Sequence, residues 1–110
     1  MTIAKIKELL NATIVTNNPN LDFETSTGFV GDLLSVVMGK AEEDCAWMTI
    51  QGHLNIVGVG SLVGVGCIIV TEGFDVDPDA IKKANEEEMM ILSTLMSSYE
   101  AAGILAKNGL

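Results

Sequence analysis

Charged residues are missing from the middle of the chain, since no Asp, Glu, Lys or Arg occurs from Cys45 to Thr71. A helix that spans a membrane needs about 20 consecutive apolar residues. The longest run here, Ile56 to Val70, is 15 residues long and contains Ser61. Acidic residues flank the segment, where the positive-inside pattern would require lysine or arginine. We therefore predict that this segment is the buried centre of a small α/β domain and not a membrane span.

Basic residues and cysteines are also scarce. With 15 acidic and 6 basic residues the net charge is −9, which argues against nucleic acid as a partner and against docking on anionic membranes. Cys45 and Cys67 lie within apolar runs and are expected to be small buried hydrophobic residues. No secretory leader pattern follows Met1. We expect a cytoplasmic protein with reduced thiols.

The common catalytic and metal-binding motifs are missing as well. The sequence has no GK[ST], CxxC, HxxxH or GxSxG pattern, and its glycines do not fit GxGxxG. We therefore predict no catalytic residue, no metal site and no cofactor, and the chain is not expected to be an enzyme. His53 is the sole histidine. An acid/base pair formed by His53 and Glu72 across adjacent turns is kept as a minor alternative.

Capping residues and apolar periodicity predict five helices. The expected starting signals are Thr2, Asp32, Asn55, the Asp77-Pro78 pair and the Ser97…Glu100 capping box. The expected ends are Asn11, Gly39, Val65-Gly66, Glu88 and Gly109.

Runs of apolar and β-branched residues predict the strands. Strands are expected at 12–16, 45–50, 67–71 and 89–92, with a turn at 17–20 and a strand or strand pair within 21–30. From Cys45 onward the order is β-α-β-α-β-α, which implies right-handed crossovers. The predicted fold is one α/β domain, residues 1–110, with a three-layer, mostly parallel central sheet and helices on both faces.

In such a sheet, ligands bind outside the carboxyl ends of the strands. Three turns should meet there and present free backbone N–H groups, which favour a small anionic or nucleotide-like ligand. The alternative is that these are ordinary capped turns. The candidate ligand-binding residues are Gly52, His53, Asn55, Thr71, Glu72, Gly73, Ser93 and Thr94.

The glycines of the predicted central helix need an explanation, because each costs about 1 kcal/mol relative to alanine. Gly60 and Gly64 are four residues apart and share a helix face. A smooth face allows either a homodimer in which this helix meets its symmetry mate or close packing of the helix on the sheet within one subunit. Both interpretations remain open from the sequence.

Several segments resemble the DRTGG family of small α/β domains. They are TIAKIKELLNATIV, VGDLLSVVMG, ILST and YEAAGILAKNGL, together with the turns Gly52-His53-Leu54 and Val70-Thr71-Glu72-Gly73. The family occurs alone, beside CBS domains in some family II pyrophosphatases and within phosphate acetyltransferases. Its fold is similar to the N-terminal domain of HPr kinase/phosphorylase. The resemblance covers nearly the whole chain.

The resemblance matches Gly52, Thr71 and Gly73 of the two turns that name the family. His53 stands in place of its acidic residue, Leu54 in place of arginine and Glu72 in place of glycine. These departures argue against a strongly anionic ligand at this site.

The resemblance implies a non-catalytic regulatory or interaction module, a homodimer with a small-ligand site at the strand carboxyl ends. A partner enzyme would be its target. The main alternative is a sensor of an adenine nucleotide or another metabolite, and the second alternative is the His53/Glu72 enzyme.

Overall fold

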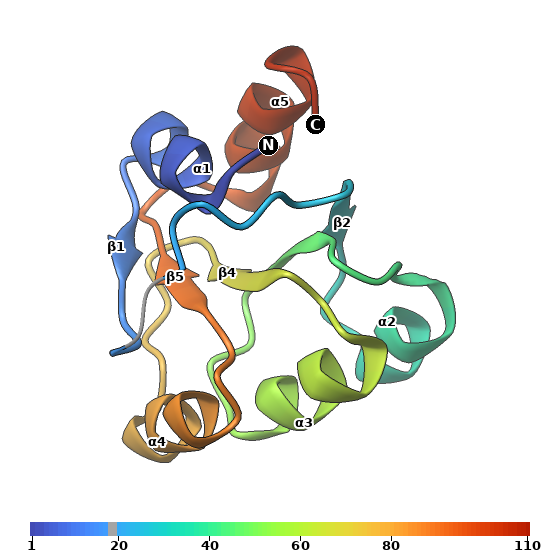
Figure 1. Cartoon of the computed structure of the whole chain (residues 1–110), viewed down its shortest axis with the longest axis vertical. Coiled ribbons are helices and arrows are strands. Elements are labelled where there is room, and N and C mark those ends of the chain that lie inside the picture. Colours follow the sequence, from blue (N-terminus) through green and yellow to red (C-terminus); the bar gives the residue numbers. More distant parts are fainter. Residues whose placement is uncertain (18–19) are drawn as a thin grey trace.

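The computed structural model describes residues 1–17 and 20–110, which form one five-stranded sheet between two layers of helices (Figure 1). The strand order is β1-β5-β4-β3-β2. The antiparallel pair joins β1 (Thr13–Ile14) to β5 (Ile91–Ser93). The neighbouring pairs among β5, β4 (Cys67–Val70), β3 (Ala46–Thr49) and β2 (Gly28–Val30) are parallel. The predicted α/β fold with a mostly parallel sheet is confirmed.

Helices cover both faces of the sheet. In Figure 1, α1 (Ile3–Leu10) and α5 (Ser98–Lys107) lie above the strands. On the opposite side lie α2 (Leu34–Lys40), α3 (Asn55–Val63) and α4 (Pro78–Glu86). Each layer has its own apolar core against the sheet. None of these helices is both long and apolar enough to cross a membrane within the part of the chain that the structure describes.

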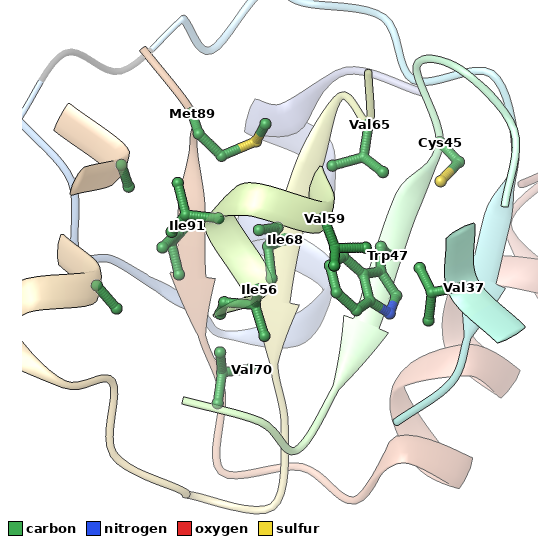
Figure 2. Close-up of a cluster of buried hydrophobic side chains, with 13 residues drawn as sticks. Val37, Cys45, Trp47, Ile56, Val59, Val65, Ile68, Val70, Met89 and Ile91 are labelled. Carbon is green, nitrogen blue, oxygen red and sulfur yellow. The ribbon is translucent and has the colours of Figure 1, made fainter. Parts of the chain in front are cut away.

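The central strands explain why the middle of the chain has no charge. Every residue of β3 and β4 is buried. Alternate side chains of these strands enter the two cores, because successive residues of a strand point to opposite faces. Figure 2 shows the ring of Trp47 beside Val59 of α3 and Val37 of α2. The Trp47 Nε1 donates to Gly31 O at 2.9 Å, so its polar atom is satisfied.

The helix ends that depend on local sequence form as predicted. Thr2 Oγ1 accepts a hydrogen bond from Lys5 N at 3.1 Å and begins α1, and Asn11 ends this helix in the left-handed region. The capping box of Ser97 and Glu100 is present at the start of α5. Asp77 occupies the N-cap position before Pro78, although its side chain does not cap the helix.

Two predicted caps are wrong. Asp32 does not cap α2, because Leu33 holds the N-cap position. The Asp32 carboxylate instead accepts hydrogen bonds from Thr49 Oγ1 at 2.9 Å and from Ile50 N at 2.8 Å. These bonds fix the chain where β3 ends. Leu54, and not Asn55, is the N-cap residue of α3.

Other boundaries shift by a few residues. Helix α3 ends at Val63, before the predicted Val65-Gly66, because Gly64 adopts the left-handed conformation. The region 21–30 contributes one strand, β2, and an isolated bridge between Thr2 and Glu24. Of the predicted turn at 17–20, residues 18–19 lie outside the described part of the chain.

Candidate functional site

The predicted turns meet at the carboxyl edge of the sheet. Thr71 N donates to Thr49 O at 3.0 Å, and Thr94 N donates to Val70 O at 2.9 Å. These bonds extend the parallel ladder by one residue beyond the end of each strand. The turns after β3, β4 and β5 are therefore adjacent, as the order of elements predicted.

The hydroxyl groups of two predicted ligand residues, Thr71 and Thr94, are already bonded within the protein. Thr71 is fully buried, and its Oγ1 lies 2.6 Å from Ser98 Oγ. Thr94 Oγ1 donates to Leu10 O at 2.8 Å, which ties the β5–α5 turn to the end of α1. Both threonines thus position the turns, and their hydroxyl groups already have partners within the chain.

The carboxylate of Glu72 lies at the N-terminus of α5. Its carboxylate accepts a hydrogen bond from Ser98 N at 2.9 Å, in the first turn of α5. A helix N-terminus favours negative charge, because its first N–H groups have no partner within the helix. Glu72 also has a φ of 63°, a backbone conformation that normally favours glycine. A glutamate with an internally bonded carboxylate therefore stands at a position whose backbone favours glycine.

Gly52 is required by a close approach between two turns. A Cβ atom at this position would overlap the carbonyl oxygen of Asp75. Asp77 N donates to Gly52 O at 2.9 Å and holds the turns together. The glycine therefore has a structural reason to be in the turn after β3.

A shallow hollow lies between these two turns and has a volume of about 340 Å³. Its lining is Ile50, Gln51, Gly52, His53, Phe74, Asp75 and Asp77. His53 Nδ1 lies 3.0 Å from Asp77 Oδ2, and the histidine side chain is 71% exposed. The lining includes two carboxylates and no lysine, so the hollow is unsuited to a phosphate.

The remaining predicted residues do not share this hollow. Asn55 lines a different concave surface. Thr71, Glu72, Gly73 and Thr94 are bonded into the turns, and Ser93 ends β5 beside Val70 of β4. His53 and Glu72 have different partners, Asp77 and Ser98, and no hydrogen bond joins the two residues in the described part of the chain. Across residues 1–17 and 20–110, no group of three or more potential metal ligands is found.

A second concave surface, the α2–α3 groove, was not predicted from the sequence. It has a volume of about 390 Å³, and its lining residues are Leu34, Met38, Leu54, Asn55, Gly58, Val59, Leu62 and Lys83. Met38, Leu54 and Leu62 are 46%, 43% and 74% exposed. The available signal was that α3 contains no charged residue and exposes Leu62, whereas the outer face of a surface helix usually carries charged residues.

The glycines of α3 face different surroundings. A Cβ on Gly60 would lie 3.1 Å from Ile68 Cδ1 and 3.2 Å from Val65 Cγ2, so this residue packs against the sheet. Gly64 ends the helix with a φ of 78°. These contacts support the interpretation of Gly60 as a helix-to-sheet packing residue. Gly58 has nothing within 4 Å of a Cβ and opens into the α2–α3 groove.

The two cysteines are free and buried. They belong to the cores on opposite faces of the sheet, which separates their side chains. Burial raises the pKa of the Cys67 thiol from 9.0 to about 12, and burial also raises the pKa of Cys45. Neither thiol is activated, because a reactive cysteine needs a lowered pKa.

These features define the class of the molecule as a small three-layer α/β domain with turns closed by internal hydrogen bonds. No protein-family model matches the chain, and no curated protein matches its sequence.

The fold is similar to a solved structure, the CBS and DRTGG domains of the regulatory region of Clostridium perfringens pyrophosphatase, complexed with the activator diadenosine tetraphosphate. The TM-score is 0.78 at 17% sequence identity, and the match covers 94% of this chain and 45% of that chain. This chain thus spans less than half of that structure's length. The predicted DRTGG-like fold is confirmed, and at this identity the likeness concerns the fold.

Proposed function

We propose that this chain is a non-catalytic regulatory or interaction module that acts as a homodimer. The α2–α3 groove is the observation that carries this proposal. Three large apolar side chains, Met38, Leu54 and Leu62, project around it at 43–74% exposure. Apolar side chains that cluster on a surface mark interaction sites more often than single exposed ones do. The regulatory role is supported by the fold shared with a pyrophosphatase regulatory region.

Charge favours a second copy of the chain as the occupant of the groove. Two molecules with a net charge of −9 repel each other over most of their surfaces. The groove has one charged lining residue, Lys83, and that side chain pairs with Glu87 at 3.1 Å. A symmetric contact here would bury apolar atoms with little like-charge repulsion. Gly58 would let the two α3 helices approach closely, because it has no side chain.

Light scattering coupled to size exclusion tests this interface. Leu62→Ser should convert a dimer to a monomer, because it removes the most exposed apolar residue of the groove. Leu95→Ser is the matched control, since Leu95 is 90% exposed and does not line the groove. This control should leave the dimer intact. A monomeric natural chain, or equal effects of the two substitutions, would refute the interface.

A small-ligand site at the strand carboxyl ends is the second part of the proposal. The hollow beside Gly52, His53 and Phe74 is the place that supports it best. Its carboxylates favour a neutral or cationic molecule over an anionic one. We also propose a cytoplasmic location, which fits two thiols held apart on opposite faces of the sheet.

The alternative of an adenine-nucleotide sensor is favoured by one observation, the diadenosine tetraphosphate with which the similar structure is complexed. The acidic hollow and the carboxylate of Glu72 at α5 oppose it. Thermal unfolding with diadenosine tetraphosphate, ATP and AMP discriminates between the two roles. A concentration-dependent rise in Tm would favour the sensor, and an unchanged Tm would favour the interaction module. The His53/Glu72 enzyme has no such supporting contact.

A further inference from the structure

Three large exposed side chains lie on the segments that follow β4 and β5. They are Phe74, Leu95 and Tyr99, with exposures of 52%, 90% and 89%. We name this set the carboxyl-end rim. Phe74 follows β4, Leu95 follows β5 and Tyr99 lies in the first turn of α5. Single exposed apolar residues are ordinary, but here two lie on loops in contact with each other and a third begins the helix that follows.

Hydrogen bonds hold these loops in one arrangement. Gly73 N donates to Thr94 O at 3.0 Å, and Glu72 N donates to Met96 O at 2.7 Å. A Cβ on Gly73 would lie 3.2 Å from Leu95 Cδ2, so the β4–α4 and β5–α5 loops are in contact.

Leu95 lies between Thr94 and Met96, and hydrogen bonds fix the positions of both of these residues. The hydroxyl group of the buried Thr94 donates to Leu10 O at 2.8 Å and accepts from Met96 N at 3.2 Å. The exposed leucine is thus presented by a well-bonded turn. Because the loop is already ordered, it loses little conformational entropy when a partner binds Leu95.

Every charged residue on these two loops and in the first turn of α5 is acidic. Asp75, Asp77 and Glu100 lie on the same loops or in the first turn of α5, and no lysine or arginine occurs in 71–81 or 93–106. His53 faces this side and is paired with Asp77 at 3.0 Å. Apolar side chains within an acidic border complement a surface with apolar and basic residues.

We propose that the carboxyl-end rim docks a segment of a partner protein in which leucine-like side chains are flanked by lysine or arginine. This inference rests on the proposed role as an interaction module but uses a surface different from the α2–α3 groove. A second copy of this chain is a poor occupant, because it would bring Asp75, Asp77 and Glu100 against their own equivalents. The rim offers apolar side chains on well-bonded loops for the leucines of such a segment, and carboxylates for its basic residues.

The probe is a pair of short synthetic amphipathic peptides, one of leucine and lysine and one of leucine and glutamate. Amide chemical shifts of the ¹⁵N-labelled chain report where each peptide binds. The lysine peptide should shift the amides of residues 72–77 and 94–100, and the glutamate peptide should not. Leu95→Ser should weaken the lysine peptide about tenfold, as expected for an anchor residue. Shifts spread over the whole surface, or no binding, would overturn the proposal.

Charge-matched variants separate the rim from general attraction to an acidic chain. Asp75→Asn/Asp77→Asn and Glu42→Gln/Glu86→Gln each change the net charge from −9 to −7, since each removes two carboxylates. The Asp75/Asp77 variant should lower the affinity for the lysine peptide several-fold. The Glu42/Glu86 variant should lower this affinity less than twofold. Equal losses would overturn the proposal.

Two further measurements separate peptide binding at the rim from dimerisation through the α2–α3 groove. Leu62→Ser should leave peptide binding unchanged even if it abolishes dimerisation, because Leu62 lines the α2–α3 groove. Shifts of the rim amides on dilution without peptide would identify a second copy as the occupant and refute a basic partner.

Discussion

At the scale of single residues, Glu72 changes the character of the site most. It adopts a φ of 63° and places its carboxylate 2.9 Å from Ser98 N. A side chain in the left-handed region costs about 1 kcal/mol, and a carboxylate at a helix N-terminus returns about 0.3–1 kcal/mol. The two effects nearly cancel, so a glycine position can hold a glutamate here. The chain thereby places a negative charge of its own at the N-terminus of α5.

Substitutions of Glu72 separate these two effects. Glu72→Ala keeps the backbone strain and loses the hydrogen bond to Ser98 N at the helix N-terminus, so the free energy of unfolding should fall by about 1 kcal/mol. Glu72→Gly loses the same hydrogen bond but relieves the strain, so it should be about 1 kcal/mol more stable than Glu72→Ala. Urea denaturation measures both variants. Greater stability of the alanine variant would contradict the account of this position.

Cys67 makes a separate prediction about pH. Because burial raises its pKa from 9.0 to about 12, the folded chain keeps the proton that the unfolded chain releases. This contribution to stability is complete below pH 9.0 and is lost as the pH rises toward 12. The free energy of unfolding should therefore fall by up to about 1.4 kcal/mol per pH unit in this window. Urea denaturation of the natural chain and of Cys67→Ala at several pH values measures this dependence. An equal fall of the unfolding free energy with pH in the two proteins would contradict the prediction.

At the scale of elements, α3 has two glycines with different roles. Gly60 packs on the sheet, and Gly58 faces outward into the α2–α3 groove. Relative to alanine, these two glycines together lower the stability of the helix by about 2 kcal/mol. Close packing on Ile68 offsets the cost at Gly60. At Gly58 the compensation would come from the proposed contact between two copies.

Paired substitutions in α3 test this division. Gly58→Ala should stabilise the isolated subunit by about 1 kcal/mol, because the Cβ meets no atom within 4 Å. Gly60→Leu should destabilise it by about 1–3 kcal/mol or more, because the side chain would enter the space held by Ile68 and Val65. Thermal unfolding at low protein concentration measures both. Equal changes at the two positions would contradict the assignment of faces.

Much of the fold could be predicted because its signals are local. Thr2 and the Ser97…Glu100 pair lie next to the helices that they cap, and β3 and β4 are recognisable as continuous apolar runs. The role of Asp32 is not visible locally, because its partners Thr49 and Ile50 lie at and just beyond the end of β3, 17 and 18 residues further along the chain.

The candidate site was harder to predict for the same reason. The order of elements brings the predicted turns together. It does not reveal that Thr71 and Thr94 bond to Ser98 and Leu10, or that the Glu72 carboxylate accepts from Ser98 N. The α2–α3 groove also depends on how two helices pack, which neither helix shows by itself.

At the scale of the whole molecule, charge and shape divide the surface into distinct regions. A net charge of −9 disfavours self-association in general. The α2–α3 groove is lined mainly by apolar residues, and the carboxyl-end rim combines apolar residues with acids. The first suits another copy of the chain and the second suits a basic partner. The proposed module would thus dimerise through one surface and bind its target through another.

Sedimentation equilibrium of the natural chain over micromolar concentrations tests the central proposal most directly. We expect a dimer, and we expect that Leu62→Ser shifts the dimer dissociation constant upward by at least about tenfold while Leu95→Ser leaves it within about twofold. Higher salt should strengthen the natural dimer slightly, because it screens the repulsion between two acidic molecules. A strict monomer throughout this range, or a dimer that Leu62→Ser does not weaken, would contradict the account.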